Sequence, residues 1–189
     1  EQHKKPKASL TRMLPGFLKP RESGDAFYVE NGRLTAAPQA FSRDPVNILR
    51  IFQMADEKSV DIHPHALRTL TRSLDLITDE LRNDPEANRI FLETLTSRHN
   101  PEWALRMMNE AGVLGRFVPE FGHAVGLMQF NMYHHYTVDE HLIRAVGNVA
   151  SIERGEHRED NPLSTEIVKR IQSRAVLYCA ILLHDIAKG

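Results

Sequence analysis

Cysteine, long apolar runs and an excess of charge of one sign are each scarce or missing in this chain of 189 residues. Its single cysteine, Cys179, excludes an intrachain disulfide framework and lies in an apolar stretch typical of a small buried side chain. No run approaches the roughly 20 apolar residues of a membrane-spanning helix. The 24 basic and 25 acidic residues leave a net charge of -1, so no overall field attracts nucleic acid or an anionic membrane. We expect a cytoplasmic protein with neither of these as a partner.

The first residues also lack the features of a protein start. Residues 1–7 contain neither an initiator methionine nor the apolar core of a signal peptide. Residues 1–25 are rich in Lys, Pro and Gly and show no sustained period, so we expect an irregular lead-in. Gly189 comes immediately after the helix expected to carry a His-Asp motif, with no terminal segment after it, and we therefore expect the chain to belong to a longer protein.

What the sequence does contain predicts an all-α fold with one small β-hairpin. Hydrophobic residues make up 41% of the chain, enough for a core. Two strand-like runs within 26–36 are joined by Asn31-Gly32, a dipeptide that favours the positive φ angles of a tight hairpin turn. Beyond the hairpin, apolar residues recur at the three- and four-residue steps of amphipathic helices. We expect the Met and aromatic residues of this pattern, such as Trp103 and Met108, in the core.

Pairs of a capping residue and a proline predict where helices begin. The capping side chain accepts a hydrogen bond from a free N–H of the first turn, and the missing N–H of proline costs nothing there. Such pairs occur at Asp44-Pro45, Asp84-Pro85, Asn100-Pro101 and Asn161-Pro162, with His63-Pro64 as a weaker case. Thr137 and Glu140 have the spacing of a capping box, which predicts a helix over about 137–151. From Pro162 to Lys188 we expect one long helix, or two separated near Gln172-Ser173.

Glycine and proline residues between 115 and 136 interrupt the helical pattern and indicate a domain boundary. We expect a helical linker region over 26–125 and a second region over 126–189. Four of the ten histidines gather near this boundary, ahead of the charged loop at 155–160: His123, His134, His135 and His141.

A histidine-aspartate pair in an otherwise apolar helix is the strongest sign of chemistry. His184 and Asp185 follow the apolar residues 180–183, and an unpaired charge in such a segment loses several kcal/mol on leaving water. Imidazole and carboxylate together suit a divalent metal. His141, in the first turn of the expected 137–151 helix, is placed to face the pair as a third ligand. Alternatively, Asp185 accepts hydrogen bonds from a neighbouring helix terminus and His184 is a core histidine with satisfied hydrogen bonds.

Three further residues are candidates for contact with a phosphate. His134 and His135 could approach a substrate phosphate, or they are loop histidines that are exposed or bonded to the backbone. Lys188 lies four residues after His184 and so on the same helical face, where its ammonium could neutralise a phosphate oxygen. A lysine at a helix C-terminus is also favourable against the helix dipole alone.

These motifs resemble the HD superfamily of metal-dependent phosphohydrolases. More narrowly, MYHHYTVDEH (132–141) and LHDIAKG (183–189) resemble segments of the bifunctional uridylyltransferase and uridylyl-removing enzymes of the bacterial PII nitrogen-signalling system. RDPVNILRIF (43–52) and NEAGVLGRFVPEF (109–121) are similar to the helical linker of the same family. The resemblance covers nearly the whole chain from about residue 14 and is more specific than the His-Asp pair alone.

The resemblance implies a function and a set of ligands. In this family a nucleotidyltransferase domain uses UTP to attach UMP to a tyrosine of PII, an HD domain removes the UMP by hydrolysis, and ACT domains sense glutamine. His141, His184 and Asp185 correspond to metal ligands, with Mg²⁺ or Mn²⁺ as the expected ion, and Lys188 would offset charge on the phosphoryl group. The transferase domain, the ACT domains and the family's final aspartate ligand have no counterpart here. We therefore expect this chain alone to be inactive and to bind metal weakly or not at all.

Two other functions stay open on the sequence alone. The segment from Asp44 to Arg50 also resembles the Asp-Pro-x-Arg-x-Leu-Arg stretch of tRNA nucleotidyltransferases. Asn47 replaces an arginine in that comparison, and the nearly neutral charge argues against tRNA as a partner. The second alternative is non-catalytic, a helical module that docks the transferase domain and offers a surface to PII.

Overall fold

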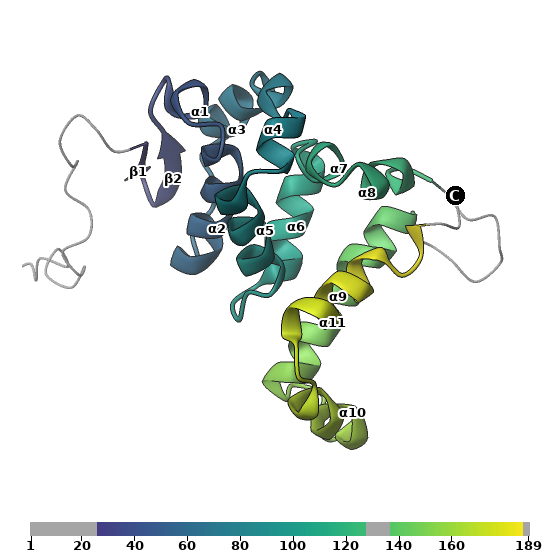
Figure 1. Ribbon diagram of the computed structural model, residues 1–189. Coiled ribbons are helices and arrows are strands. Elements are labelled where there is room, and N and C mark those ends of the chain that lie inside the picture. The colour runs from purple at the N-terminus through teal and green to yellow at the C-terminus, as the bar shows by residue number, and fades with distance from the viewer. Residues whose placement is uncertain (1–25, 128–136, 187–189) are drawn as a thin grey trace, which may run out of the picture.

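The computed structural model describes residues 26–127 and 137–186. Over these ranges the chain is mainly helical with one small antiparallel hairpin, as the sequence predicts (Figure 1). Within them, no helix is both long and apolar enough to cross a bilayer. The lead-in expected over residues 1–25 lies outside the described residues. The helices in chain order are α1 (Ala40–Arg43), α2 (Asn47–Lys58), α3 (Pro64–Thr71), η1 (Leu74–Leu76), α4 (Asp79–Arg82), α5 (Pro85–Leu95), α6 (Pro101–Glu110), α7 (Leu114–Phe117), α8 (Pro119–Ala124), α9 (Val138–Arg154), α10 (Pro162–Ile167), η2 (Val168–Arg170) and α11 (Arg174–Leu183).

The predicted hairpin is present and is attached to the helices by its second strand. β1 (Phe27–Glu30) pairs with β2 (Arg33–Ala36), and the turn residues Asn31 and Gly32 take φ angles of 49° and 77°. Both angles lie in the left-handed region that this dipeptide tolerates. Leu34 of β2 is buried, and its backbone hydrogen bonds to the loop before α3 hold the hairpin against the helical body.

The main core lies between α2, α5 and α6, which contact one another pairwise. Each helix turns one apolar face to the other two, as the three- and four-residue spacing of the sequence requires. Burying each large apolar side chain contributes roughly 1.5–3 kcal/mol. Met108 is buried as predicted, whereas Trp103 is only partly buried. The fully buried side chains include Ile48, Leu49 and Phe52 of α2, Ile90 and Leu95 of α5, and Leu105 of α6.

Most of the predicted helix starts are confirmed. α5 and α6 begin at the expected prolines, and the side chains of Asp84 and Asn100 accept hydrogen bonds from backbone N–H groups in the first turn. α3 and α10 also begin at the predicted prolines. The start expected at Asp44-Pro45 is wrong, because α2 begins at Asn47.

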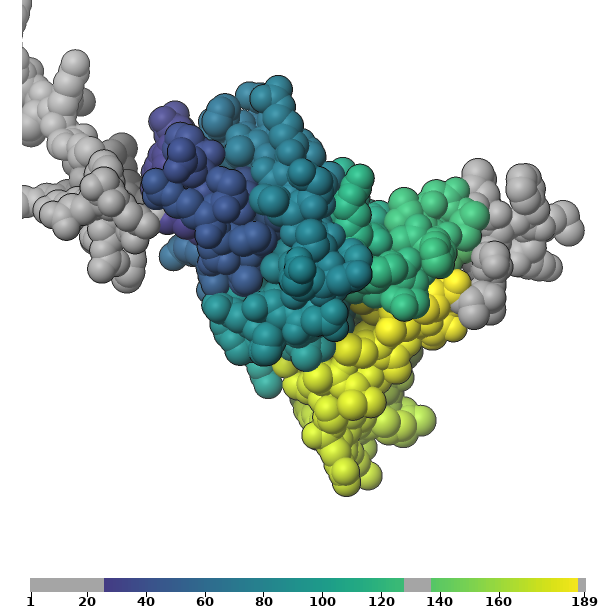
Figure 2. Space-filling model, turned by 45° about the horizontal axis from the view of Figure 1, so that its top comes forward, coloured from purple at the N-terminus to yellow at the C-terminus, as the bar shows by residue number. Residues whose placement is uncertain are grey.

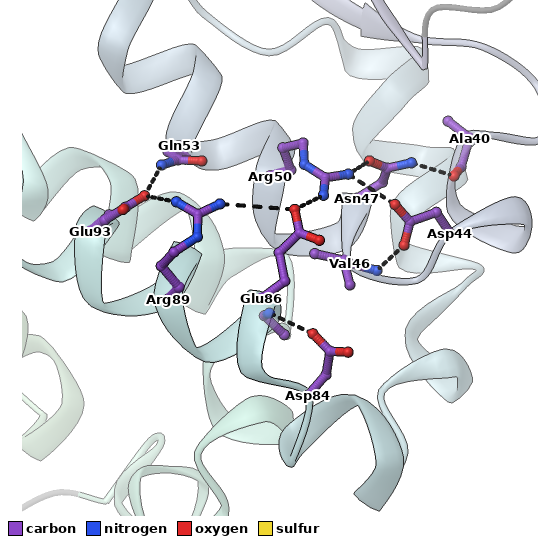
Figure 3. A network of polar contacts seen from close by, with 11 residues as sticks. Ala40, Asp44, Val46, Asn47, Arg50, Gln53, Asp84, Glu86, Arg89 and Glu93 are labelled. Atoms are coloured by element: carbon purple, nitrogen blue, oxygen red, sulfur yellow. Dashed lines mark hydrogen bonds and ion pairs between the residues drawn. The ribbon is translucent and has the colours of Figure 1, made fainter.

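Asp44 instead joins a polar network that links α1, α2 and α5 (Figure 3). Its carboxylate pairs with Nη1 of Arg50 at 2.9 Å. Arg50 also pairs with Glu86 at the start of α5. Asn47, which is buried, donates from its side chain to the backbone carbonyl of Ala40 at 2.8 Å. Oδ1 of Asp44 also accepts a hydrogen bond from the backbone N–H of Val46 at 3.1 Å, so these contacts together hold the residues between α1 and the start of α2.

α9 and α11 form the second helical part and lie side by side (Figure 1). The break expected near Gln172-Ser173 is confirmed, because α10 and η2 end before it and the Ser173 side chain caps α11. The C-terminal segment, yellow in Figure 2, packs directly under the teal body, where α11 contacts α5. The domain division into 26–125 and 126–189 stays a prediction.

The capping box expected at the start of α9 is wrong. Thr137 is the N-cap residue, but its side chain makes no cap hydrogen bond to the helix. Glu140 pairs instead with Arg106 of α6, so its carboxylate is used in tertiary structure. α9 also runs past the expected end near Ser151 and stops at Gly155, which takes a φ angle of 82°.

Cys179 is half-buried, although the sequence predicts a buried side chain. Tyr178 and Leu182, four residues apart, are the buried residues of α11 and define its inner face. Cys179 is one residue, or about 100°, further round the helix. The burial that remains raises the pKa of its thiol.

Candidate metal centre

The three predicted ligands meet where the start of α9 lies beside the end of α11. His141 belongs to α9, His184 and Asp185 follow α11, and one ligand atom of each lies within 4.8 Å of the others. Nε2 of His141 is 3.9 Å from Oδ2 of Asp185, and Nε2 of His184 is 3.8 Å from Oδ1. The two imidazole rings are 5.4 Å apart between centroids. Among the residues that the structure describes, this is the only group of His, Cys, Asp or Glu with such a spacing.

The His-Asp pair follows the helix, whereas the sequence predicts that it lies inside it. α11 ends at Leu183, and the last carbonyls of a helix have no intrahelical N–H partner. The ring of His184 uses one of them, because its Nδ1 lies 2.7 Å from the carbonyl oxygen of Ile181. A carbonyl oxygen only accepts, so Nδ1 carries the proton and donates. The lone pair of neutral His184 is therefore on Nε2, the atom near Asp185.

Asp185 is the buried member of the cluster, and the two imidazoles lie nearer the surface. The Asp185 side chain is 10% exposed, compared with 39% for His141 and 40% for His184. Neither of the N–O distances to this carboxylate is a hydrogen bond, because both exceed 3.5 Å. The site thus has a buried carboxylate at its base and two accessible imidazoles beside it.

The donor set and its spacing fit a divalent metal ion. Two imidazole nitrogens and one carboxylate oxygen are the protein ligands of many catalytic metal sites, which leave further positions for water or substrate. An ion about 2.1 Å from each donor separates the donors by about 3.0–3.5 Å. The observed distances of 3.8 and 3.9 Å, which run to different oxygens of Asp185, would need to shorten by about 0.3–0.9 Å. The widest separation in the set is at most 4.8 Å and would need to shorten by no more than about 1.8 Å. The bond from Nδ1 of His184 to a carbonyl is also the usual second contact of a metal-binding histidine.

Three residues at the far end of the two helices determine how α9 and α11 lie against each other. Glu153, near the end of α9, accepts hydrogen bonds from Nη2 of Arg174 at 2.6 Å and from the hydroxyl of Tyr178 at 2.9 Å. The hydrogen bond from Arg174 is the main reason why the pKa of Glu153 is lowered. Burial, with the bond to Glu153, raises the pKa of Tyr178 to about 12. We call Glu153, Arg174 and Tyr178 the Glu153 clamp. The clamp joins the end of α9 to the start of α11, so the two helices run antiparallel.

The first turn of α9 is anchored by α6. Oδ2 of Asp139 accepts a hydrogen bond from Nδ2 of Asn109 at 2.8 Å, and Oδ1 accepts one from the backbone N–H of Gly126 at 3.3 Å. Glu140 pairs with Arg106. Burial opposes ionisation of Asp139, but the hydrogen bonds outweigh it and hold the pKa of this carboxyl below its usual value. The candidate ligand on α9 follows these two acidic residues directly.

Of the other candidates noted in the sequence, only His123 lies within the described residues. His123 is exposed on α8 and is not a member of it. His134, His135 and Lys188 lie outside the described residues, so their proposed contacts with a phosphate stay predictions.

Sequence reasoning missed the residues that anchor the two site helices. Their partners are far apart in the chain, so no local pattern pairs them. One signal was available at Asp139, because a carboxylate among the buried residues of a helix requires a donor. The pairs and their separations in sequence are Glu153 with Arg174 (21), Asn109 with Asp139 (30) and Arg106 with Glu140 (34).

The fold and the cluster define a mainly helical protein with a candidate divalent-metal centre between two antiparallel helices. Residues 27–117 match the family described as the uridylyltransferase GlnD third domain. The whole chain aligns, at 52% identity over 197 residues, with the bifunctional uridylyltransferase/uridylyl-removing enzyme of Rhodopseudomonas palustris. The chain spans 21% of the length of that relative. The resemblance that the sequence motifs indicate is thereby confirmed.

Proposed function

We propose that this chain supplies the metal-binding helices of the uridylyl-removing site in a bifunctional uridylyltransferase/uridylyl-removing enzyme. The observation that carries the proposal is the cluster of His141, His184 and Asp185, with ligand atoms within 4.8 Å of one another. The relative that is 52% identical over the whole chain supports it, since its name includes uridylyl removal. Release of UMP from a protein tyrosine cleaves a phosphodiester, a reaction class that divalent metals assist.

In this proposal each residue of the cluster has a defined role. His141 and His184 would hold the metal through Nε2, and Asp185 would hold it through its carboxylate. When bound, an ion such as Mg²⁺ or Mn²⁺ polarises the phosphoryl group and makes water nucleophilic near neutral pH. The carbonyl of Ile181 keeps Nδ1 of His184 protonated, so the ring presents Nε2 without a tautomer change. Lys188 would offset negative charge on the phosphoryl group.

The wider function that we propose is the one that the sequence resemblance implies, and the name of the relative supports its two activities. A nucleotidyltransferase part would attach UMP from UTP to PII, the site described above would remove it, and glutamine would control the balance between the two activities. Residues 27–117, which match the third domain of this family, would connect the two activities. The tRNA nucleotidyltransferase alternative loses support in the core, because Asn47, at the position of that family's arginine, donates to the carbonyl of Ala40 and is buried.

Manganese binding tests the site itself. Of the two outcomes that the sequence leaves open for this chain, weak metal binding or none, the assembled cluster favours weak binding. In a titration followed by the electron paramagnetic resonance of free Mn²⁺, we therefore expect one weak site per chain that is lost in His184→Ala and in Asp185→Asn. The control is His123→Ala, which removes an exposed histidine outside the cluster and should leave binding unchanged. Absence of binding by the parent chain up to millimolar Mn²⁺, or retention of it in His184→Ala, would contradict the proposed ligands.

Uridylyl removal is tested in a chimera in which this chain replaces the matching segment of the Rhodopseudomonas palustris enzyme. We expect the chimera to release UMP from uridylylated PII in the presence of Mn²⁺, and His184→Ala to reduce the rate at least 100-fold. The separate uridylyltransferase activity serves as the internal control for folding. Equal rates of UMP release with and without the substitution would rule out the proposed role.

A further inference from the structure

We infer that Asn109 and Arg106 of α6 are positioning residues for the metal centre, which they influence by holding the first turn of α9. Both residues lie in the segment that matches the GlnD third domain, whereas α9 and α11 lie outside it. The inference rests on the proposed function, because it assigns to the linker region a direct effect on the uridylyl-removing site.

Asn109 acts on α9 through Asp139. This carboxylate is 6% exposed and uses one oxygen for the Asn109 amide and the other for the backbone N–H of Gly126. Through these two hydrogen bonds, Asp139 in the first turn of α9 contacts both α6 and the segment after α8. A buried carboxylate with both oxygens bonded has little freedom to move, because each lost bond leaves a desolvated group. His141 is two residues further along the same turn, so its backbone position depends on this tie.

Arg106 acts on the same turn through Glu140. One arm of its guanidinium pairs with Glu140 of α9 and the other with Glu102 of its own helix, at 2.8 Å. Beyond this contact α6 and α9 approach closely at Gly147, where a Cβ atom would overlap the side chain of Glu102. The two helices are therefore fixed against each other both at the site and further along α9.

The consequence for the metal centre is geometric. The Glu153 clamp joins α11, which leads to His184 and Asp185, to the far end of α9. His141 is held from α6. Loss of the α6 contacts therefore frees the first turn of α9, and His141 with it, to move relative to His184 and Asp185. The observed N–O distances of 3.8 and 3.9 Å are within about 1 Å of coordinating distances, so a small movement of this turn changes whether one ion can contact all three ligands.

The test exchanges the two groups of the Asn109–Asp139 hydrogen bond. Asn109→Asp places a second carboxylate at 2.8 Å from Asp139 and should weaken Mn²⁺ binding about 10-fold, as measured by the resonance of free Mn²⁺. Adding Asp139→Asn restores a carboxylate–amide pair in the reverse order, while the new side-chain carbonyl can still accept from Gly126. The double variant should bind Mn²⁺ within threefold of the parent chain. Circular dichroism and thermal unfolding establish that each variant is folded at the temperature of the titration.

A matched control separates this effect from a general loss of stability. Gln53 of α2 donates to Glu93 of α5 at 2.7 Å, which is also an amide–carboxylate bond between two helices (Figure 3). Gln53→Glu should therefore affect thermal stability without changing the affinity for Mn²⁺. If Asn109→Asp proves unfolded, Arg106→Gln removes the charge opposite Glu140 and is expected to weaken binding at least threefold.

The possible outcomes distinguish the two proposals. If His184→Ala abolishes binding but folded Asn109→Asp and Arg106→Gln both bind within twofold of the parent chain, the inference about α6 is wrong and the proposed ligands stand. If Asn109→Asp weakens binding and Asp139→Asn does not rescue it, the effect is not specific to the pair and the inference is also overturned. If His184→Ala binds Mn²⁺ normally, or the parent chain does not bind it, the proposed function fails and the inference fails with it.

Discussion

Nδ1 of His184 donates a hydrogen bond to the carbonyl oxygen of Ile181 over 2.7 Å, and this contact leaves Nε2 as the ring atom beside Asp185. It arises because α11 ends at Leu183, one residue before the histidine, so that a carbonyl of the last turn is available to the ring. The end of the helix thus determines which nitrogen of His184 can serve as a ligand.

The first prediction concerns the tautomer of this ring. We expect neutral His184 to be protonated on Nδ1, whereas the Nε2–H form predominates in free histidine side chains. Long-range ¹H–¹⁵N correlation spectra at pH 8 distinguish the two forms, and His123, which is exposed, provides the internal reference. A spectrum in which Nε2 of His184 carries the proton would contradict the hydrogen bond to Ile181.

A second prediction concerns acid stability and the Glu153 clamp. The pKa of Glu153 in the folded chain lies below its ordinary value of 4.5, mainly because Arg174 donates to it. The pairing therefore contributes stability above about pH 4.5, and this contribution is lost as the pH falls through the lower folded-state pKa. Glu153→Gln should reduce the free energy of unfolding by about 1–2 kcal/mol at pH 7 and by much less near pH 3. Urea denaturation of the parent and the variant at the two pH values measures this change in the free energy of unfolding.

The matched control for the clamp is Glu93→Gln. Glu93 pairs with Arg89 in an exposed pair on α5, and such pairs contribute roughly 0–1 kcal/mol. Its effect on unfolding should be smaller than that of Glu153→Gln at pH 7. An equal loss in the two variants, or a loss in Glu153→Gln that does not depend on pH, would argue against a partly buried ionic clamp.

The third prediction tests the close approach of α6 and α9. Gly147→Ala adds a Cβ atom that overlaps the side chain of Glu102. Alanine is the better helix former by about 1 kcal/mol, but overpacking in a fixed interface costs about 1–3 kcal/mol. We expect a net loss of stability in urea denaturation, while Asn148→Ala on the exposed side of α9 should stay within about 0.5 kcal/mol of the parent. A net gain from Gly147→Ala would mean that the helices can separate freely.

The fourth prediction concerns the network of Figure 3. Asn47→Ala removes the buried donor to the carbonyl of Ala40 and a partner of Arg50. We expect a loss of about 1–3 kcal/mol in the free energy of unfolding, because the carbonyl is left without this donor. Arg89→Ala, in an exposed ion pair of the same network, should have a smaller effect. Equal effects of the two substitutions would show that the burial of Asn47 does not matter.

The sequence predicts those features that depend on neighbouring residues. The caps at Asp84 and Asn100 reach N–H groups only three positions away, and both helix starts are correct. The hairpin is also correct, because its turn depends on Asn31 and Gly32 alone. In each case the donor and acceptor, or the turn and its strands, lie within a few residues.

Features that depend on distant partners could not be predicted in this way. Asp44 and Glu140 both have the local pattern of a helix start, yet each pairs with an arginine of the tertiary structure, Arg50 and Arg106 respectively. The carboxylate of Asp44 makes both kinds of contact, because Oδ1 accepts from the backbone N–H of Val46 while Oδ2 pairs with Arg50. The anchoring of α9 by Asn109 was missed for the same reason, since its partner Asp139 lies 30 positions away.

For the candidate site, the sequence indicated the residues and the structure supplied their arrangement. His141, His184 and Asp185 come together between α9 and α11, and the His-Asp pair lies just after the helix that was expected to contain it. Periodicity alone could not place this helix end, because apolar residues resume at Ile186 and Ala187 after the His-Asp pair.

The most direct measurement for the central claim is anomalous diffraction from a crystal soaked in Mn²⁺, with data collected at the manganese absorption edge. The account predicts one strong peak about 2.0–2.3 Å from Nε2 of His141, Nε2 of His184 and a carboxylate oxygen of Asp185. The same experiment on His184→Ala should show no peak at this place. A parent crystal with no peak between these three residues, or with manganese bound only elsewhere, would contradict the claim that they hold a divalent metal.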